Sequence, residues 1–429
     1  MPDSTTNRSV MSAGVAVVED ALVAAVAVGD EAATGQPTGV VRQRLDSVDA
    51  LRGLVMVIMA LDHVRDYFHH DAPFFDPTDL TKTNVALFFT RWVTHFCAPV
   101  FIFLAGTGAF LSASRGKKTK AELSRFLLTR GLWLILLELT IINSSWSFRL
   151  GLQFFIVQVI WAIGVSMIVL AVLIYLPVWV ITAFGLLMIA THNLFDAVQA
   201  GSLGAFSGLW ATLHSRELTE TYGGIHVFTM YPLIPWIGVM AAGYGFGQLF
   251  LLEREHRRRL MLRLGAACTL LFIILRAINV YGDPHPWAAQ KNALYTFLSF
   301  INCEKYPPSL LFLLMTLGPA IIILALLERF NREPVPGLVR PLVVFGRVPL
   351  FYYILHIPFI HALAIAFAFA KYGSALDEVF KSGRPPADYG YSLPVVYLIW
   401  VGVVLALYPV CRWFAGVKRR RRDAWLSYL

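Results

Sequence analysis

The chain has 429 residues, of which 57% are hydrophobic, 14% are aromatic and only 15% are charged. Soluble domains carry about 25% charged residues, so a single water-soluble core is excluded for a chain of this length. Apolar stretches close to the roughly 20 residues that cross a bilayer recur along the sequence. We therefore predict an all-α, polytopic transmembrane helical bundle, and we exclude disorder, collagen and coiled coil for most of the chain.

The N-terminal residues 1–42 are rich in Ala, Val, Gly and Thr and are interrupted by acidic residues. They lack both the clustered basic start and the uninterrupted apolar core of a signal peptide. This composition predicts a disordered tail over 1–42, followed by one membrane domain over 43–429.

Ten apolar stretches define the expected topology. They cover roughly residues 51–68, 95–112, 124–141, 153–175, 178–194, 230–251, 260–280, 308–328, 342–369 and 392–414. The fifth is the weakest, and an eleventh segment is allowed within 195–229. Alternate connections carry 21 against 9 lysines and arginines, and because cytoplasmic loops are enriched in these residues, both termini are expected in the cytoplasm. The basic loops lack interleaved aromatic residues, so a nucleic-acid partner is not expected.

Three patterns in the sequence suggest a disulfide framework, a nucleotide-binding turn or a metal site, but none has the residue spacing that such a feature requires. The four cysteines form no CxxC pair, which argues against a disulfide framework and a zinc cage. The glycines of segment 243–247 lie within a predicted span, where small residues let helices approach closely, and their spacing is wrong for a dinucleotide turn. The run 69–71, His-His-Asp, has no second ligand cluster of recognisable spacing, so no metal is predicted.

The first span carries ionisable residues at both ends. Arg52 and His63 are 11 residues apart, which at roughly 100° per residue returns to within about 20° of the same direction, and His70 continues the stripe. Asp62 and Asp66 lie one and three residues from His63. One interpretation is a capped, water-exposed helix end. The other is a histidine that carboxylates hold in one tautomer, which predicts His63 as a general base supported by Asp62 or Asp66.

Three arginines are expected at similar depth near the cytoplasmic side. Arg52 opens the first span, while Arg130 and Arg347 lie about two turns into the third and ninth. Guanidinium groups suit phosphates, so these residues are candidates to bind an anionic cofactor from the cytoplasm. Snorkelling to lipid headgroups, or capping of a neighbouring helix, is the structural alternative.

Polar residues also converge toward the outer side. His63 and His356 fall at comparable depth, each about 12 to 14 residues into its span, and Glu138 lies at a similar level. Such groups suit one membrane-embedded cavity. A lone histidine such as His356 is more often a packed, hydrogen-bonded residue.

The first span resembles the first helix of membrane acyltransferases that carry acyl groups from cytosolic coenzyme A to extracytoplasmic sugars. The resemblance rests on Asp49-Ala50-Leu51-Arg52-Gly53 with His63 eleven residues after the arginine. Four further stretches are similar to the bacterial heparan-α-glucosaminide N-acetyltransferase-like branch of that family, namely 158–166, 231–240, 305–310 and 345–353. The resemblance runs from Arg44 to Trp413 and departs from the lysosomal members at one point. They have asparagine at the position of His63 and histidine about 11 residues later, where this chain has Phe74.

The resemblance implies a membrane transferase that binds cytosolic acyl-CoA, with acetyl-CoA expected, between Arg52, Arg130 and Arg347. An amino sugar or other glycan would approach from outside, and the base would be His63, His69 or His70. The residues expected to contact the acceptor are Glu138, His356, Gln158 and Trp236, while Trp92, Trp146 and Trp236 are candidates to stack on sugar faces. Interfacial tryptophans, however, often only anchor helices.

The implied setting is the cytoplasmic membrane of a bacterium, with a homodimer allowed. The alternative function is a proton-coupled secondary transporter of a small molecule. Such folds commonly contain internal repeats, and the two halves of this sequence do not match, which favours the enzyme.

Overall fold

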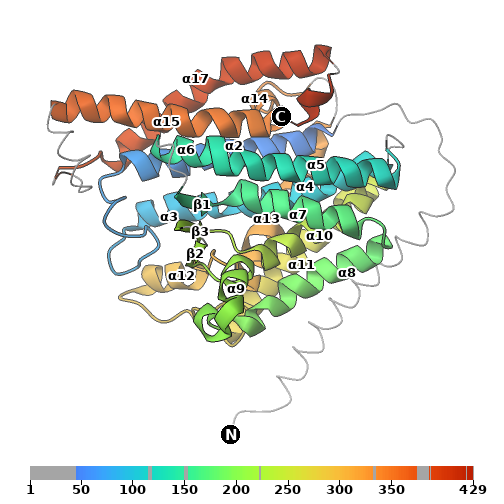
Figure 1. The fold of residues 1–429 in the computed structure, drawn as a ribbon, viewed down its shortest axis with the longest axis horizontal. Coiled ribbons are helices and arrows are strands. Elements are labelled where there is room, and N and C mark those ends of the chain that lie inside the picture. The colour runs from blue at the N-terminus through green and yellow to red at the C-terminus, as the bar shows by residue number, and fades with distance from the viewer. Residues whose placement is uncertain are drawn as a thin grey trace, which may run out of the picture.

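The computed structural model describes residues 45–114, 118–148, 153–221, 224–331, 335–373, 386, 388–421 and 423–428. Long helices lie side by side, as Figure 1 shows, which confirms the predicted polytopic helical bundle. The tail predicted over 1–42 lies outside the described residues.

The elements follow the chain in two halves. The first half forms α2 (Asp46–Phe68), α3 (Val85–Val93), η1 (Thr94–Phe96), α4 (Cys97–Ser114), α5 (Lys120–Leu137), η2 (Glu138–Ile142), α6 (Asn143–Ser147), β1 (Phe154–Val157), α7 (Val159–Leu173), α8 (Val178–Thr191), η3 (His192–Phe195), η4 (Ala200–Phe206) and α9 (Ser207–Leu213). The second half forms β2 (Leu218–Thr221), β3 (Ile225–Thr229), α10 (Leu233–Phe246), η5 (Gly247–Leu251), α11 (Arg254–Ile278), α12 (Ala293–Ile301), α13 (Leu310–Leu327), η6 (Glu328–Phe330), α14 (Arg340–Arg347), α15 (Pro349–Tyr372), α17 (Leu393–Arg420) and η8 (Ala424–Ser427).

Each of the ten predicted stretches coincides with helical structure. Within the described residues, eight helical runs are long and apolar enough to cross a bilayer. Two of the ten stretches are not among them: α2 because of its charged residues and α7 because it is only 15 residues long. The elements described within 195–229 have at most seven residues each, too short to form the eleventh span that the sequence allowed.

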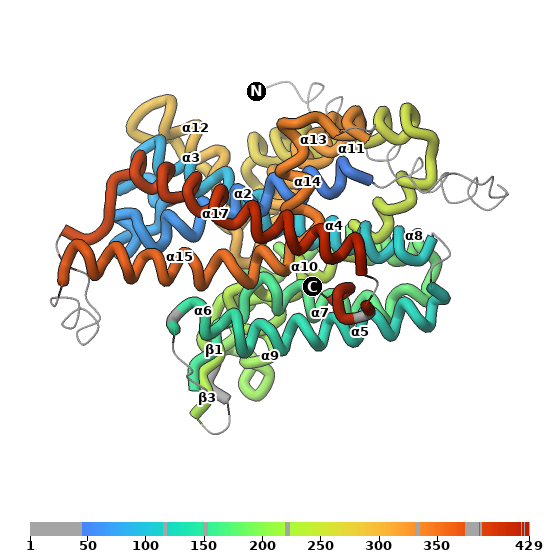
Figure 2. Tube along the Cα trace, turned by 90° about the horizontal axis from the view of Figure 1, so that it is seen from above, coloured from blue at the N-terminus to red at the C-terminus, as the bar shows by residue number. Residues whose placement is uncertain are grey.

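The structure also contains a small three-stranded sheet, which the hydropathy pattern did not predict. Its first strand precedes α7, and the other two follow α9. Its strand order is β1-β3-β2, with β1 parallel and β2 antiparallel to β3. The residues Phe154–Val157 form β1, so the apolar stretch predicted to start at residue 153 becomes helical only at Val159. Figures 1 and 2 both place the sheet at one end of the bundle, close to α6.

Two glycines let α2 and α14 cross with their backbones in contact. A Cβ atom on Gly53 would lie 2.6 Å from the carbonyl carbon of Leu342, and one on Gly346 would lie 2.6 Å from that of Asp49. Only glycine fits such a crossing, as at other close helix contacts in membranes. Because each glycine is next to an arginine in sequence, the crossing brings the first and ninth predicted spans together near their arginines.

The glycines of segment 243–247 pack helices, as predicted. A Cβ on Gly243 would lie 2.9 Å from the Phe103 carbonyl carbon, and one on Gly245 would lie 2.9 Å from the Thr182 side chain. Helix α10 therefore lies directly against α4 and α8, and nearly all of its residues are buried.

Candidate active site beside the α2 crossing

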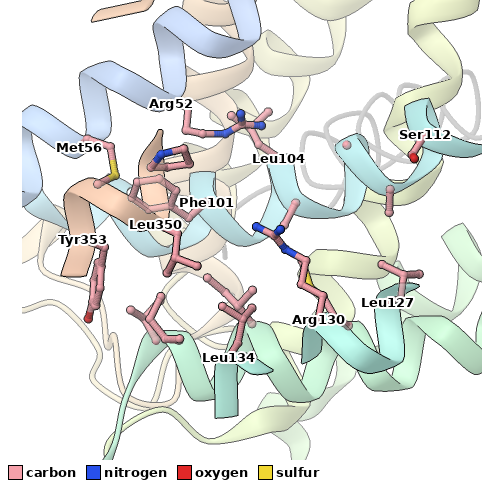
Figure 3. Close-up of a pocket in the computed structure, with 18 of the residues that line it drawn as sticks. Arg52, Met56, Phe101, Leu104, Ser112, Leu127, Arg130, Leu134, Leu350 and Tyr353 are labelled. Carbon is pink, nitrogen blue, oxygen red and sulfur yellow. The ribbon is translucent and has the colours of Figure 1, made fainter. Parts of the chain in front are cut away.

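A cavity of about 290 Å³ opens beside the crossing of α2 and α14. Its walls are mostly apolar side chains of α2, α4, α5, α7 and α15, and its polar lining includes Arg52, Arg130, Arg347 and Lys418. All three arginines singled out in the sequence thus line one cavity. Figure 3 shows Arg52 and Arg130 reaching into this space from different helices, with Tyr353 at the end away from Ser112.

Arg52 and Arg347 are anchored by acidic residues of the first turn of α2. Nη1 of Arg52 donates to Oδ1 of Asp49 at 3.3 Å and to the carbonyl oxygen of Gly346 at 3.2 Å. Nη2 of Arg347 donates to Oδ1 of Asp46 at 3.0 Å, and its Nε lies 3.8 Å from Asp49. Each guanidinium has five donor hydrogens. These contacts orient both side chains beside the cavity.

Arg130 contacts the C-terminal segment. Its Nη1 donates to the backbone carbonyl of Ser427, and the hydroxyl of Thr129 lies 2.8 Å from that of Tyr428. The Tyr428 ring also packs on Phe126 at 5.8 Å. The end of the chain therefore lies against α5 at the arginine-lined part of the cavity, where Figure 2 also shows it.

Two histidines lie beyond the end of the cavity that is opposite to Ser112. Tyr353 lines the cavity, and its ring lies 5.3 Å from that of His356, which in turn lies 5.2 Å from the His63 ring. Nδ1 of His356 lies 2.8 Å from the Tyr353 carbonyl, a position that requires its proton. Nε2 of His356 and Nδ1 of His63 are buried and have no hydrogen-bond partner among the described residues. The sequence placed these two histidines at a comparable distance along their spans, and in the structure their rings are neighbours.

The two carboxylates next to His63 have different surroundings. Oδ2 of Asp66 lies 3.9 Å from Nδ1 of His63, near but beyond direct hydrogen-bond distance. Asp62 is held by two guanidinium groups, with Arg65 at 2.9 Å and Arg91 at 2.5 Å. The expectation that Asp62 supports His63 therefore has no geometric basis, because that carboxylate points to the arginines.

The other two candidate histidines lie on the loop after α2. Nδ1 of His69 accepts a hydrogen bond from the backbone of Asp71 at 3.2 Å, and burial, helped by neighbouring His70, lowers the pKa of His69 to about 4. Such a weakly basic ring is a poor proton acceptor near neutral pH. His70 is half exposed and pairs with the Asp71 carboxylate at 2.8 Å. Neither ring lines the cavity, and the same is true of the rings of His63 and His356, which lie beyond Tyr353.

Aromatic side chains surround His63 toward the C-terminal end of α2. The Trp146 ring lies edge-on to His63 at 4.9 Å, and Tyr67 stacks on Trp146 at 5.9 Å. His361 stacks on Tyr67 at 4.8 Å and on Phe148 at 4.1 Å. Sequence reasoning named Trp146 but missed Tyr67 and His361. Helical spacing was an available signal for Tyr67, which is four residues after His63. It was not one for His361, which is five residues after His356 and so lies on a different face of the helix.

The other residues expected to contact the acceptor occupy structural positions. Glu138 is fully buried, and its Oε2 accepts a hydrogen bond from the Trp161 backbone at 3.1 Å, so it caps the start of α7. Gln158 is the half-buried residue before that helix. Trp236 is 0% exposed and packs on Tyr231 at 5.5 Å, which leaves it no open face for a sugar.

The fold and the site define an integral membrane protein whose arginine-lined cavity ends at Tyr353, next to the buried His356 and the half-buried His63. The family model for the catalytic domain of heparan-alpha-glucosaminide N-acetyltransferase matches residues 44–281, more than half of the chain. The chain belongs to this family of membrane acetyltransferases. No curated protein matches it significantly. The matched segment contains Arg52, His63 and Arg130, while Arg347 and His356 follow it.

Proposed function

We propose that the protein transfers an acetyl group from cytosolic acetyl-CoA to an extracytoplasmic amino sugar or other glycan. The observation that carries this proposal is the connection from an arginine-lined cavity, through Tyr353, to the His356–His63 pair. Family membership supports acetyl transfer and favours it over the transporter alternative.

The cavity suits the donor in both charge and shape. Pockets for small ligands are commonly about 300–1,000 Å³, so a cavity of about 290 Å³ fits the narrow pantetheine arm better than the whole cofactor. The phosphates would then lie at the arginines, where Arg52, Arg130 and Arg347 supply fork-shaped donors. Lys418 adds a fourth positive charge to the same lining.

His63 is the proposed general base. It would take a proton from the acceptor amine or hydroxyl as that atom attacks the thioester carbonyl, and the carbon–sulfur bond would then break to release coenzyme A. Asp66, 3.9 Å away, would stabilise the imidazolium that forms. His356 presents an unprotonated Nε2 on the same buried face, because its Nδ1 proton is directed to backbone carbonyls. This nitrogen is suited to orient the His63 ring or the attacking group.

The acceptor is proposed to bind at the aromatic group around the outer side of His63. Tyr67, Trp146, Phe148 and His361 present stacked ring faces, and Phe148 is 48% exposed. Flat rings of this kind pack well against the apolar faces of sugars. We further propose one membrane domain over 43–429, both termini in the cytoplasm, and residence in a bacterial cytoplasmic membrane.

The proposal is tested with purified full-length protein in nanodiscs, labelled acetyl-CoA and a panel of amino sugars. His63→Ala should lower acetyl transfer by about 10²–10⁴-fold, the usual effect of removing a general base, while coenzyme A binding is retained. His70→Ala is the matched control, with a histidine on the exposed loop.

Near-full transfer by His63→Ala together with loss of transfer by His70→Ala would assign the base to the outer loop. If no amine or hydroxyl acceptor were acetylated and the protein did not bind coenzyme A, the proposal that acetyl-CoA is the donor would be rejected.

A further inference from the structure

A second cluster of ionisable side chains lies apart from the cavity, at the end of α8 where the chain enters η3. His192, Asp196 and His214 each offer one ligand atom, and these three atoms all lie within 4.8 Å of one another. Nε2 of His214 lies 3.7 Å from Oδ1 of Asp196 and 2.9 Å from the backbone carbonyl of His192. The two histidines are 22 residues apart in sequence, so only the fold brings them together.

The His192 side chain lacks the partners that a buried imidazole normally has. It is 1% exposed, and among the described residues neither ring nitrogen makes a hydrogen bond of normal geometry, although the Pro308 carbonyl lies near the ring. A buried polar group without a hydrogen bond is costly, and a bound ion is one of the arrangements that satisfies it. The Pro308 carbonyl lies near the ring, in the kind of position that orients a metal-bound histidine through its second nitrogen.

The other two members complete a donor set. His214 is 3% exposed and stacks on Trp210 at 5.1 Å, which fixes the plane of its ring. The Asp196 carboxylate is 23% exposed and is oriented by the Asn193 amide at 2.8 Å, so an ion has a route in from the surface.

We propose that His192, Asp196 and His214 bind one Zn²⁺ ion that joins η3 to α9. Two imidazole nitrogens and one carboxylate oxygen are a zinc donor set, whereas magnesium and calcium select oxygen ligands. The fourth position is left for water. To ligate zinc through Nε2, the His214 ring must carry its proton on Nδ1 and give up its hydrogen bond to the His192 carbonyl.

The ion has a structural role in this proposal. Residues between the two histidines form η4 and α9, and the strands β2 and β3 of the small sheet follow directly. A bound ion would crosslink the end of α8 to the end of α9 and so close residues 192–214 into a loop. This loop would restrict the unfolded chain and would hold the sheet in place next to α7. The group of His69, His70 and Asp71 is a weaker candidate, because His70 is half exposed and neither histidine is a buried ring without hydrogen bonds, as His192 is among the described residues.

The test is metal content and thermal stability of the full-length protein in detergent, after chelation and dialysis against Zn²⁺ alone. About one zinc per chain should be retained, and zinc should raise the unfolding temperature and slow hydrogen exchange in α9. Asp196→Asn keeps the shape of an exposed side chain and should weaken zinc binding at least about tenfold, with His214→Gln as the stronger variant. His256→Gln, on the exposed face of α11, is the control that should bind zinc normally.

Substitution of Co²⁺ gives a readout on the unmutated protein. The visible spectrum should become that of a four-coordinate ion with nitrogen ligands, even if a histidine variant fails to fold. Less than stoichiometric zinc, an unchanged Co²⁺ spectrum, equal affinity in Asp196→Asn, or loss of binding only in His70→Gln would each overturn the proposal.

Discussion

The crossing of α2 and α14 is expected to tolerate no side chain at residue 346. In Gly346→Ala, the new Cβ would lie 2.6 Å from the Asp49 carbonyl carbon, whereas ordinary contact begins at 3.4 Å. The two helices must therefore separate by at least about 0.8 Å at this point. Overpacking of this kind typically destabilises by about 1–3 kcal/mol. Since Asp49 also anchors Arg52, the separation should disturb the cavity as well as the fold.

The assay is thermal unfolding in nanodiscs combined with measurement of coenzyme A affinity. Gly402→Ala is the matched control, because a Cβ on this α17 residue meets nothing within 4 Å. It should be neutral, or stabilising by roughly 0.4–1 kcal/mol, since alanine restricts the unfolded chain. Gly346→Ala should unfold at lower temperature and bind coenzyme A more weakly. Equal stability and affinity of the two variants would show that the crossing is looser than described and would refute the packing argument.

Three further predictions concern the donor site, acid sensitivity and topology. Alanine at Arg52, Arg130 or Arg347 should weaken coenzyme A binding by about ten- to hundredfold each, because charge-assisted hydrogen bonds contribute about 1.5–3 kcal/mol; unchanged dissociation constants in all three variants would remove the donor site. His69→Gln should lessen the loss of thermal stability as pH falls from about 6.5 to about 4, because a buried ring whose pKa is lowered to about 4 takes up its proton on unfolding. Superimposable pH profiles of variant and parent would argue against that assignment. Reporter fusions at both ends should give cytoplasmic signals, and an extracytoplasmic C-terminus would require an odd number of spans.

Depth along a helix could be read from the sequence because the rise per residue of an α-helix is constant. Counting residues from the start of each span placed Arg52, Arg130 and Arg347 at one level, and the structure has them in one cavity. The same count placed His63 and His356 together, and their rings lie 5.2 Å apart. These successes required only helical geometry and the common orientation of three spans.

Lateral neighbours could not be read in this way. Arg91 belongs to a connection in the sequence pattern, yet α3 returns it to Asp62 at 2.5 Å, and this pairing removes that carboxylate from His63. Trp236 is of a residue type that often anchors helices at the membrane interface. Close packing through Gly243 and Gly245, however, buries its helix, α10, on nearly all sides. The predicted stretch 153–175 also joined β1 to α7, because Phe154–Val157 is apolar like the helix that follows it.

In the proposed reaction, helix α2 connects the donor site to the acceptor site. Arg52 and His63 are separated by 11 residues, which at 1.5 Å per residue is about 16 Å along the axis. In the proposed reaction, an extended pantetheine arm covers this distance inside the apolar cavity, so the donor phosphates remain with the inner arginines while the thioester reaches His63. The proposed acceptor then needs to enter the protein only as far as the aromatic side chains around Trp146. Because the acetyl group alone passes from one substrate to the other, no alternating-access motion of the bundle is required, and this agrees with the absence of a repeated half in the sequence.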